Sequence, residues 1–227
     1  MKELFSEYGV KARLFPALLC VPPFLLLKHF AVDPFIDPSL TKLWVVAAGD
    51  VSLAAVLMYL LSQINRFVSK TLFEARAEFP TTRMLLPSCE DVSDEFRQKI
   101  DQRVRADFQL SLPSAADESA GLENAKTRIM EAVSLIINKV GKGKLLLQHN
   151  IEYGFMRNLI GGAVVAFTTS FISVLLFRFV ATNKTAFVIA VVLVGIYALP
   201  IVFSRSILAN YSKAYALILF REYIGDK

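Results

Sequence analysis

The chain has 227 residues, of which 55% are hydrophobic, and its 25 Lys and Arg outnumber its 20 Asp and Glu. The hydrophobic fraction exceeds that of an ordinary water-soluble domain. A basic excess would serve nucleic-acid binding only if it were gathered on one surface. The polar segment 66–157 instead holds 14 basic and 13 acidic residues, which argues against a nucleic-acid-binding surface and against direct nucleic-acid partners.

Apolar segments are the main feature of the sequence in chain order. A bilayer core needs roughly 20 apolar residues per helix. Three prolines predict that the first candidate is kinked or shallow, because proline removes a backbone donor. The four candidate spans are Leu14–Val32, Leu43–Ile64, Leu159–Ala181 and Ala186–Phe203.

The spacing of these spans predicts an all-α integral membrane protein with four transmembrane helices. They form two hairpins, with a small helical cytosolic domain inserted between them. Most basic residues lie outside the two expected outer loops, so the positive-inside rule places both termini in the cytoplasm. The expected divisions are 1–64, the N-terminal tail and first hairpin; 65–157, the cytosolic domain; 158–204, the second hairpin; and 205–227, a C-terminal amphipathic helix.

Two helices of the expected cytosolic domain have clear signals. Ser93 is a candidate N-cap, and apolar residues then recur every four positions, which predicts a helix over 94–108 with one buried stripe. A second helix is expected over 122–140. The first stripe comprises Phe96, Ile100, Val104 and Phe108, and the second comprises Ile129, Val133, Ile136, Ile137 and Val140.

The remaining cytosolic segments connect these helices. We expect the second span to continue as a helix over 64–79, and we interpret 79–87 as a turn or an extended segment because proline disfavours the α conformation in the residue before it. The segment 112–121 is interpreted as a polar linker, and 108–112 as a segment that could form one short strand. The glycines at 141–144 end one helix, and another runs from Leu145 straight into the third span.

An internal similarity relates the approaches to the first and third spans. Glu-Tyr-Gly followed by Arg occurs in both 6–14 and 151–159. Two copies of one hairpin would be related by an axis along the membrane normal. Chance identity of three residues is the alternative.

Asp50 is the principal candidate for a functional residue within the membrane. An ionisable group there costs roughly 2.5 to 3.5 kcal/mol on insertion scales and usually has a partner or faces water. Lys28 and Arg178 are the candidate partners. Three interpretations stay open: a structural ion pair, a polar residue of an ion pathway, and basic side chains that reach the headgroups beside a hydrated Asp50.

Two further groups are candidate interaction surfaces. Small and hydroxylated residues on the third span predict a helix-packing face, within or between subunits, with a pore lining as the alternative. Polar residues of the cytosolic segments could bind a soluble partner or a phosphate-bearing ligand, or simply contact lipid headgroups. The packing residues are Gly161, Gly162, Ala163, Thr169 and Ser173, and the cytosolic residues are Thr81, Thr82, Arg83, Lys142, Lys144, Tyr153 and Arg157.

Signals for enzymatic chemistry are weak, and we expect no enzyme activity, cofactor or metal. The only histidines, His29 and His149, are far apart and have no cysteine or carboxylate at metal-ligand spacing. The glycine-rich segment 141–144 lacks the spacing of a phosphate-binding loop. Cys20 and Cys89 are expected to remain thiols in the cytosolic redox environment.

Pro-Thr-Thr-Arg-Met-Leu-Leu at 80–86 and Glu-Tyr-Gly-Phe-Met-Arg-Asn-Leu-Ile-Gly at 152–161 resemble phrases in small membrane proteins found with anti-phage defence genes. The four-span plan is similar to CBASS-type effectors and to the Kiwa membrane component. The resemblance implies an oligomeric bacterial inner-membrane protein that senses infection, or perturbs the membrane on a signal from a soluble partner or a nucleotide. A small channel or transporter subunit, and a non-conducting anchor or scaffold for a soluble partner, are the alternatives.

Overall fold

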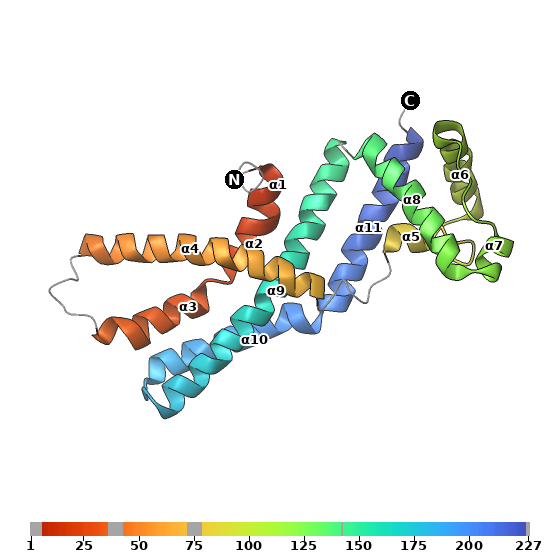
Figure 1. Ribbon diagram of the computed structural model, residues 1–227. Coiled ribbons are helices and arrows are strands. Elements are labelled where there is room, and N and C mark those ends of the chain that lie inside the picture. Colours follow the sequence, from red (N-terminus) through yellow and green to blue (C-terminus); the bar gives the residue numbers. More distant parts are fainter. Residues whose placement is uncertain (1–5, 36–42, 72–78, 142, 226–227) are drawn as a thin grey trace. The chain divides into compact units, whose positions relative to one another are not determined.

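The computed structural model describes residues 6–35, 43–71, 79–141 and 143–225 (Figure 1). The chain divides into two compact units. Unit 1 comprises 1–75 and 154–207, and unit 2 comprises 76–153 and 208–227. The described residues are helical and contain no strand. The expected all-α class is therefore confirmed, while the possible strand at 108–112 is not formed: the helix extends to Phe108, and Gln109 ends it in the left-handed conformation.

Unit 1 begins with a broken helical segment. It is kinked after Cys20 because Pro22 and Pro23 follow and supply no backbone donor. The kink matches the expectation for this span. Its elements are α1 (Glu7–Gly9), η1 (Val10–Leu14), α2 (Phe15–Leu19), α3 (Pro22–Leu27), η2 (Lys28–Val32) and η3 (Asp33–Phe35).

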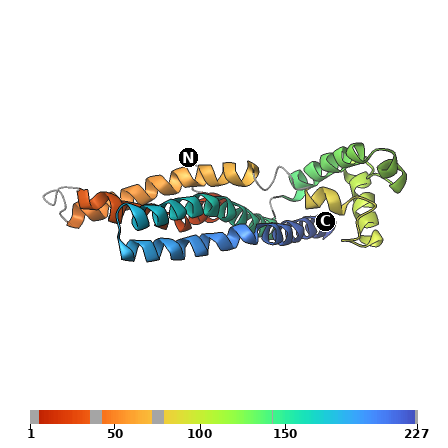
Figure 2. The ribbon, with the colours of Figure 1, turned by 90° about the horizontal axis from the view of Figure 1, so that it is seen from below.

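Three longer helices complete unit 1: α4 (Leu43–Ser69), most of α9 (Lys144–Phe179), and α10 (Lys184–Val202). The hairpin of α9 and α10 turns at Thr182, and Figure 2 shows its two helices side by side. Among the described residues, the segments long and apolar enough to cross a membrane are Glu7–Val32, Leu145–Phe179 and Lys184–Val202. The expected second span lies in α4, which is not one of these three, so the four-span arrangement stays a prediction.

Two apolar clusters hold the helices of unit 1 together. One joins α2, α4, α9 and α10 around Leu61, Ala163 and Tyr197. The other packs Leu26 of α3 against Phe177 and the start of α10. Small buried residues, among them alanines of α2, α9 and α10, allow these helices to approach closely.

Unit 2 is built from short and medium helices. Its elements are α5 (Pro80–Met84), α6 (Asp94–Phe108), α7 (Ala115–Ala120), α8 (Leu122–Val140), the first part of α9 and most of α11 (Ser204–Gly225). The predicted bounds of α6 and α8 are confirmed. Ser93 caps α6, accepting a hydrogen bond from the Phe96 amide at 3.3 Å.

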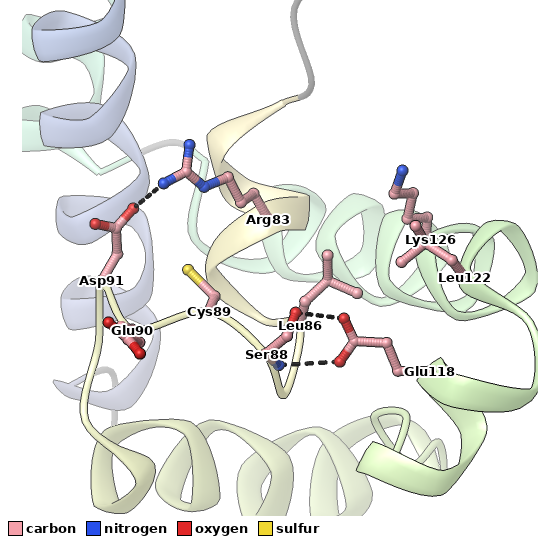
Figure 3. Close-up of a pocket in the computed structure, with 9 residues that line it drawn as sticks. All are labelled: Arg83, Leu86, Ser88, Cys89, Glu90, Asp91, Glu118, Leu122 and Lys126. Carbon is pink, nitrogen blue, oxygen red and sulfur yellow. Dashed lines mark hydrogen bonds and ion pairs between the residues drawn. The ribbon is translucent and has the colours of Figure 1, made fainter.

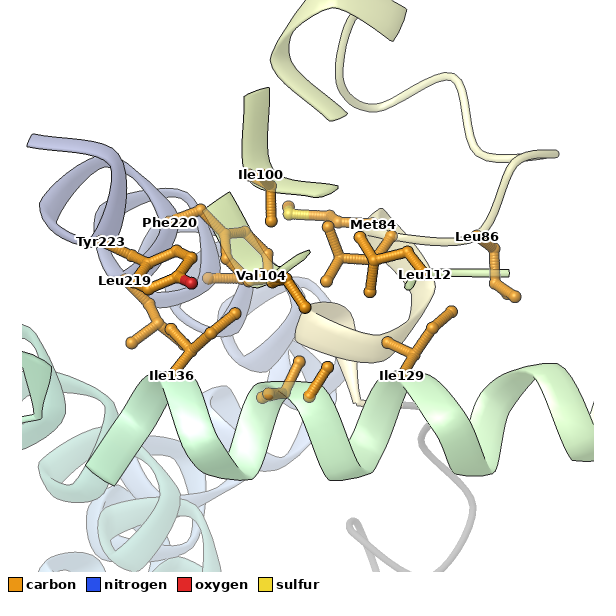
Figure 4. Packing of buried hydrophobic residues seen from close by; sticks show 14 of the residues in the cluster. Met84, Leu86, Ile100, Val104, Leu112, Ile129, Ile136, Leu219, Phe220 and Tyr223 are labelled. Carbon is orange, nitrogen blue, oxygen red and sulfur yellow. The ribbon is translucent and has the colours of Figure 1, made fainter. Parts of the chain in front are cut away.

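The core of unit 2 lies between α6, α8 and α11 (Figure 4). Ile100 and Val104 of α6 meet Ile129 and Ile136 of α8, and all four side chains are fully buried. The C-terminal helix α11 adds Ala216, Leu219, Phe220 and Tyr223. Residues 208–227 therefore share one core with 76–153.

Some sequence expectations for unit 2 are wrong. The segment 79–87, expected to be a turn or extended, contains the helix α5, because Pro80 occupies the first helical turn, where its missing donor costs nothing; Phe79, just before it, is extended. The expected linker at 112–121 contains α7, which a reciprocal capping box between Ser114 and Asp117 starts. Ile137 does not join the buried stripe and is 37% exposed.

The helices next to the expected membrane boundaries follow the sequence in part. α9 is one helix from Lys144 to Phe179, as expected, so it contributes residues to both units. α4 ends at Ser69, and the rest of the helix expected over 64–79 lies partly outside the described residues. Gly141 forms the C-cap of α8, in agreement with the predicted break.

Candidate functional site

Lys28 has a partner that sequence reasoning missed. Its Nζ donates to both carboxylate oxygens of Asp33, at 2.9 and 3.1 Å. The side chains are 21% and 24% exposed, and His29 Nδ1 lies 3.4 Å from the same carboxylate. The π-helical turn η2 brings residues five apart together, a spacing that the usual three- and four-residue rule does not include.

The other two residues of the expected intramembrane group differ in what the structure describes. Asp50 lies in α4, but its side chain is outside the described part of the chain, so its partner stays a prediction. Arg178 is near the end of α9, with its guanidinium carbon 5.7 Å from the centre of the Phe179 ring. Such a cation–π contact suits a basic side chain near the end of a span.

The small residues of α9 lie where α4 crosses it. Gly161, Gly162 and Ala163 are buried, and a Cβ atom on Gly161 would overlap the carbonyl oxygen of Asn65. A Cβ on Gly162 would overlap the Asn65 side chain and the Cys20 sulfur. The structure thus places these glycines at a contact within the subunit, where the absence of side chains allows the backbones to meet.

The hydroxyl groups of the same helix bond to their own backbone. Thr169 donates to the carbonyl of Val165 at 3.0 Å, and Ser173 donates to the carbonyl of Thr169 at 2.8 Å. Ser173 is fully buried. Hydrogen bonds of this kind satisfy polar groups inside an apolar bundle.

The expected cytosolic surface is divided between the units. Thr81, Thr82 and Arg83 lie on α5, where Thr82 is 4% exposed and is therefore not available to a ligand. Tyr153 belongs to unit 2 and Arg157 to unit 1. Lys142 lies outside the described residues, and Lys144 begins α9 with a side chain that is not described.

Arg83 is one wall of a pocket in unit 2 (Figure 3). The pocket has a volume of about 520 Å³ and lies between α5, the following loop, α7 and α8. Sequence reasoning pointed to Arg83 but not to the loop that follows it. The lining residues are Arg83, Leu86, Ser88, Cys89, Glu90, Asp91, Glu118, Leu122 and Lys126.

Asp91 organises the charges at the rim of this pocket. It accepts hydrogen bonds from Lys213 of α11 at 2.6 Å and from Arg83 at 3.1 Å. The hydrogen bond from Lys213, together with the positive charges of Lys213 and Arg83, holds the pKa of Asp91 below its ordinary value. Asp91 therefore stays ionised near neutral pH and ties α5 to α11.

A second contact holds the pocket loop to α7. Glu118 accepts hydrogen bonds from the Ser88 amide, at 2.9 Å, and from the Ser88 hydroxyl. Arg97 supports the loop from α6, donating to the carbonyl of Cys89 at 2.7 Å. These contacts fix the backbone of 87–91, so the pocket has a defined shape and walls of both charges.

Ser88 and Cys89 are the residues of the pocket lining that carry a hydroxyl or a thiol. The Ser88 hydroxyl is bonded to a carboxylate, and neither histidine lines the pocket. His149 Nδ1 lies 3.3 Å from Glu152, and His29 Nδ1 lies 3.4 Å from Asp33, so the expectation that neither histidine has a carboxylate at close spacing is wrong. Within the described residues, no group of three potential metal ligands comes together. Cys20 and Cys89 are free thiols.

Comparisons with protein-family models, with curated proteins and with solved structures found no match to this chain. What the chain does must therefore be argued from its own residues.

Proposed function

We propose that this chain is a multi-pass protein of the bacterial inner membrane that acts in anti-phage defence as a membrane-held sensor. In this proposal the helical unit 2 receives the signal, and unit 1 holds it at the membrane. The observation that carries the proposal is the pocket between α5, α7 and α8, whose loop is held by Asp91 and Glu118. A polar pocket with walls of both charges suits a nucleotide or a segment of a soluble protein.

The polar groups of unit 1 favour sensing over conduction. Among the described side chains, Lys28 is bonded to Asp33, Tyr197 donates to the carbonyl of Leu19 at 2.7 Å, and Asn158 donates to that of Ala12. Buried polar groups that are engaged in this way hold helices together. The alternative, a channel or transporter subunit, would depend on Asp50 and on buried Asn65, whose side-chain amide has no hydrogen-bond partner among the described residues.

The finer topology is part of the same proposal. We infer four spans, with α4 as the second, and we place unit 2 and both termini in the cytoplasm by the distribution of basic residues. A homo-oligomer is proposed as the functional form. Cysteine labelling from each side of the membrane, at Thr182 in the turn between α9 and α10 and at Ser119 in α7, would test the orientation, and crosslinking in membranes would test the assembly.

The decisive experiment measures phage plating efficiency and single-cell membrane potential with the native locus. We expect wild type to protect with a steady potential, the pair Arg83→Gln and Lys126→Gln to lose protection, and Asp50→Asn to keep it. The control pair Lys99→Gln and Arg105→Gln changes the same charge on α6, away from the pocket, and should protect normally. Immunoblots of membrane fractions verify equal amounts of each variant.

Two results would contradict the proposal. Depolarisation that requires both phage and Asp50 would instead identify a membrane-permeabilising effector. Absence of protection by the wild-type locus against a broad phage panel would reject the defence role and favour a housekeeping transporter.

A further inference from the structure

The two units differ in how their basic side chains are neutralised. In unit 2, eight described basic residues form ion pairs with carboxylates. In unit 1, the carboxylates with described side chains are Glu7, which pairs with Lys11, and Asp33, which pairs with Lys28. The described part of unit 1 therefore holds more positive charge than its own carboxylates can neutralise.

Much of this uncompensated charge lies where three helical segments meet. Asn158 of α9 donates to the carbonyl of Ala12 in η1 at 2.7 Å, and Arg13 is the next residue. The backbone of α4 at Asn65 and Ser69 meets Gly161. The residues that follow these two are Arg66, in α4, and Lys70, directly after its end. We call Arg13, Arg66 and Lys70 the basic crossing.

Two side chains of the basic crossing are exposed, and that of Arg13 is half-buried. Successive residues of a helix point about 100° apart, so each cation flanks a buried contact residue. Arg66 and Lys70 are exposed, and the guanidinium carbon of Arg13 lies 5.5 Å from the centre of the Tyr8 ring. Within the described chain, none of the three pairs with a carboxylate.

The position of the crossing along the apolar helices indicates the ligand. Gly161 follows closely after Arg157, which precedes the long apolar run of α9. Tyr8 and Tyr153, in the two Glu-Tyr-Gly segments, are the residue type that gathers at membrane–water interfaces. Cations at that depth meet phospholipid phosphates, which attract basic residues near the surface.

We propose that the basic crossing binds the phosphate of an anionic phospholipid headgroup. Two helical segments, η1 and the end of α4, supply the cations, so the bound lipid also joins η1 to α4 where both pack on α9. This inference does not depend on a role in defence, and it goes beyond the nonspecific contact that any basic residue near a membrane makes. It predicts a preference for an anionic lipid over a zwitterionic one.

The test is the melting temperature of the purified full chain in mild detergent, titrated with phosphatidylglycerol, with phosphatidylcholine or with inorganic phosphate. A ligand that binds the folded state raises the melting temperature. We expect phosphatidylglycerol to raise it by about 5 °C more than phosphatidylcholine does. The triple variant Arg13→Gln, Arg66→Gln, Lys70→Gln should lose most of this difference.

Two control proteins make the result interpretable. The triple variant Lys99→Gln, Lys184→Gln, Arg221→Gln removes the same charge elsewhere and should keep the full lipid effect. The pair Arg13→Lys, Arg66→Lys keeps the charge and should retain most of it. If the first triple variant does not yield folded protein by gel filtration, the single variants Arg66→Gln and Lys70→Gln, at exposed positions, are measured instead.

Three outcomes would overturn the inference. Equal effects of the two lipids would show that the basic crossing does not distinguish an anionic headgroup from a zwitterionic one. An undiminished preference in the basic-crossing variants would place any lipid site elsewhere. A rise with inorganic phosphate equal to that with phosphatidylglycerol would assign the site to free phosphate rather than to a lipid.

Discussion

The side-chain amide of Asn158 donates a hydrogen bond to the main-chain carbonyl of Ala12 at 2.7 Å, joining residues 146 positions apart. Asn158 is 1% exposed and Ala12 is fully buried. The two residues lie in the two segments that share Glu-Tyr-Gly, so these similar segments pack on each other. Whether they arose by duplication stays a prediction.

Replacing Asn158 with Ala should destabilise unit 1. The change removes a buried interhelical hydrogen bond and leaves a small void, and we expect the free energy of unfolding to fall by about 1 to 2 kcal/mol. Unfolding in a detergent titration, followed by circular dichroism, measures this loss. Asn138→Ala, at an exposed position on α8, is the control and should change it little. Equal stability of the two variants would contradict the assigned role.

Two glycine substitutions should have opposite consequences. Gly161→Ala places a methyl group against the Asn65 backbone and should destabilise the protein by about 1 to 3 kcal/mol. Gly195→Ala meets nothing within 4 Å and should be neutral or stabilising by up to about 1 kcal/mol, because alanine favours the helix. Melting temperatures of the two variants provide the comparison. A harmless Gly161→Ala would show that α4 and α9 are not in close contact.

Neighbouring isoleucines of α8 allow a matched test of the unit 2 core. Ile136 is fully buried and Ile137 is 37% exposed. Ile136→Ala should lower the free energy of unfolding by about 2 to 4 kcal/mol, whereas Ile137→Ala should cost less than about 1 kcal/mol. Hydrogen exchange of the α8 amides reports on this unit directly. Similar losses from both changes would be inconsistent with the described orientation of α8.

Unit 2 should lose stability in acid. Hydrogen bonds from Lys213 and Lys139, respectively, are the main cause that holds the pKa values of Asp91 and Asp107 below their ordinary range. The unfolded chain then binds more protons near pH 4, so the free energy of unfolding falls as pH falls. The contribution is complete above about pH 5 and is lost at lower pH, once the folded carboxyls protonate.

The pH prediction is tested with paired carboxyl variants. Asp91→Asn with Asp107→Asn should flatten the decline of the melting temperature between pH 5 and pH 3, because an amide does not take up a proton in this range. The effect is modest, since each ion pair contributes at most about 1 kcal/mol at such partly exposed positions. Glu95→Gln with Glu131→Gln removes the same charge from exposed sites and should leave the decline in place. An unchanged slope in the aspartate variant would rule out these two groups as its cause.

Local sequence signals predicted the helices better than the contacts between them. The cap at Ser93 and the stripe through Ile100 and Val104 define α6 because both signals are local. α5 was missed because Pro80 was interpreted only as a break, although proline also starts helices. α7 carried a recognisable Ser-x-x-Asp signal at Ser114 that was interpreted as linker.

The candidate sites depended more on tertiary structure. Arg83 was identified from the sequence, but its partner Asp91 was not. Asp91 also pairs with Lys213, which is 122 positions further along the chain. No local pattern indicates such a pair. The contact of Asn65 with Gly161 likewise depends on where α4 crosses α9. The small residues suggested close packing but could not identify the partner helix.

Phe220 and Tyr223 follow α10 in the sequence, yet they complete the hydrophobic core that α6 and α8 begin. During synthesis the ribosome has already made α9 and α10 when these aromatic side chains emerge. Until then, Val104 and Ile136 lack the residues that cover them. The core of unit 2 is therefore completed only after α10 has been made, and a chain that stops within α10 cannot complete it.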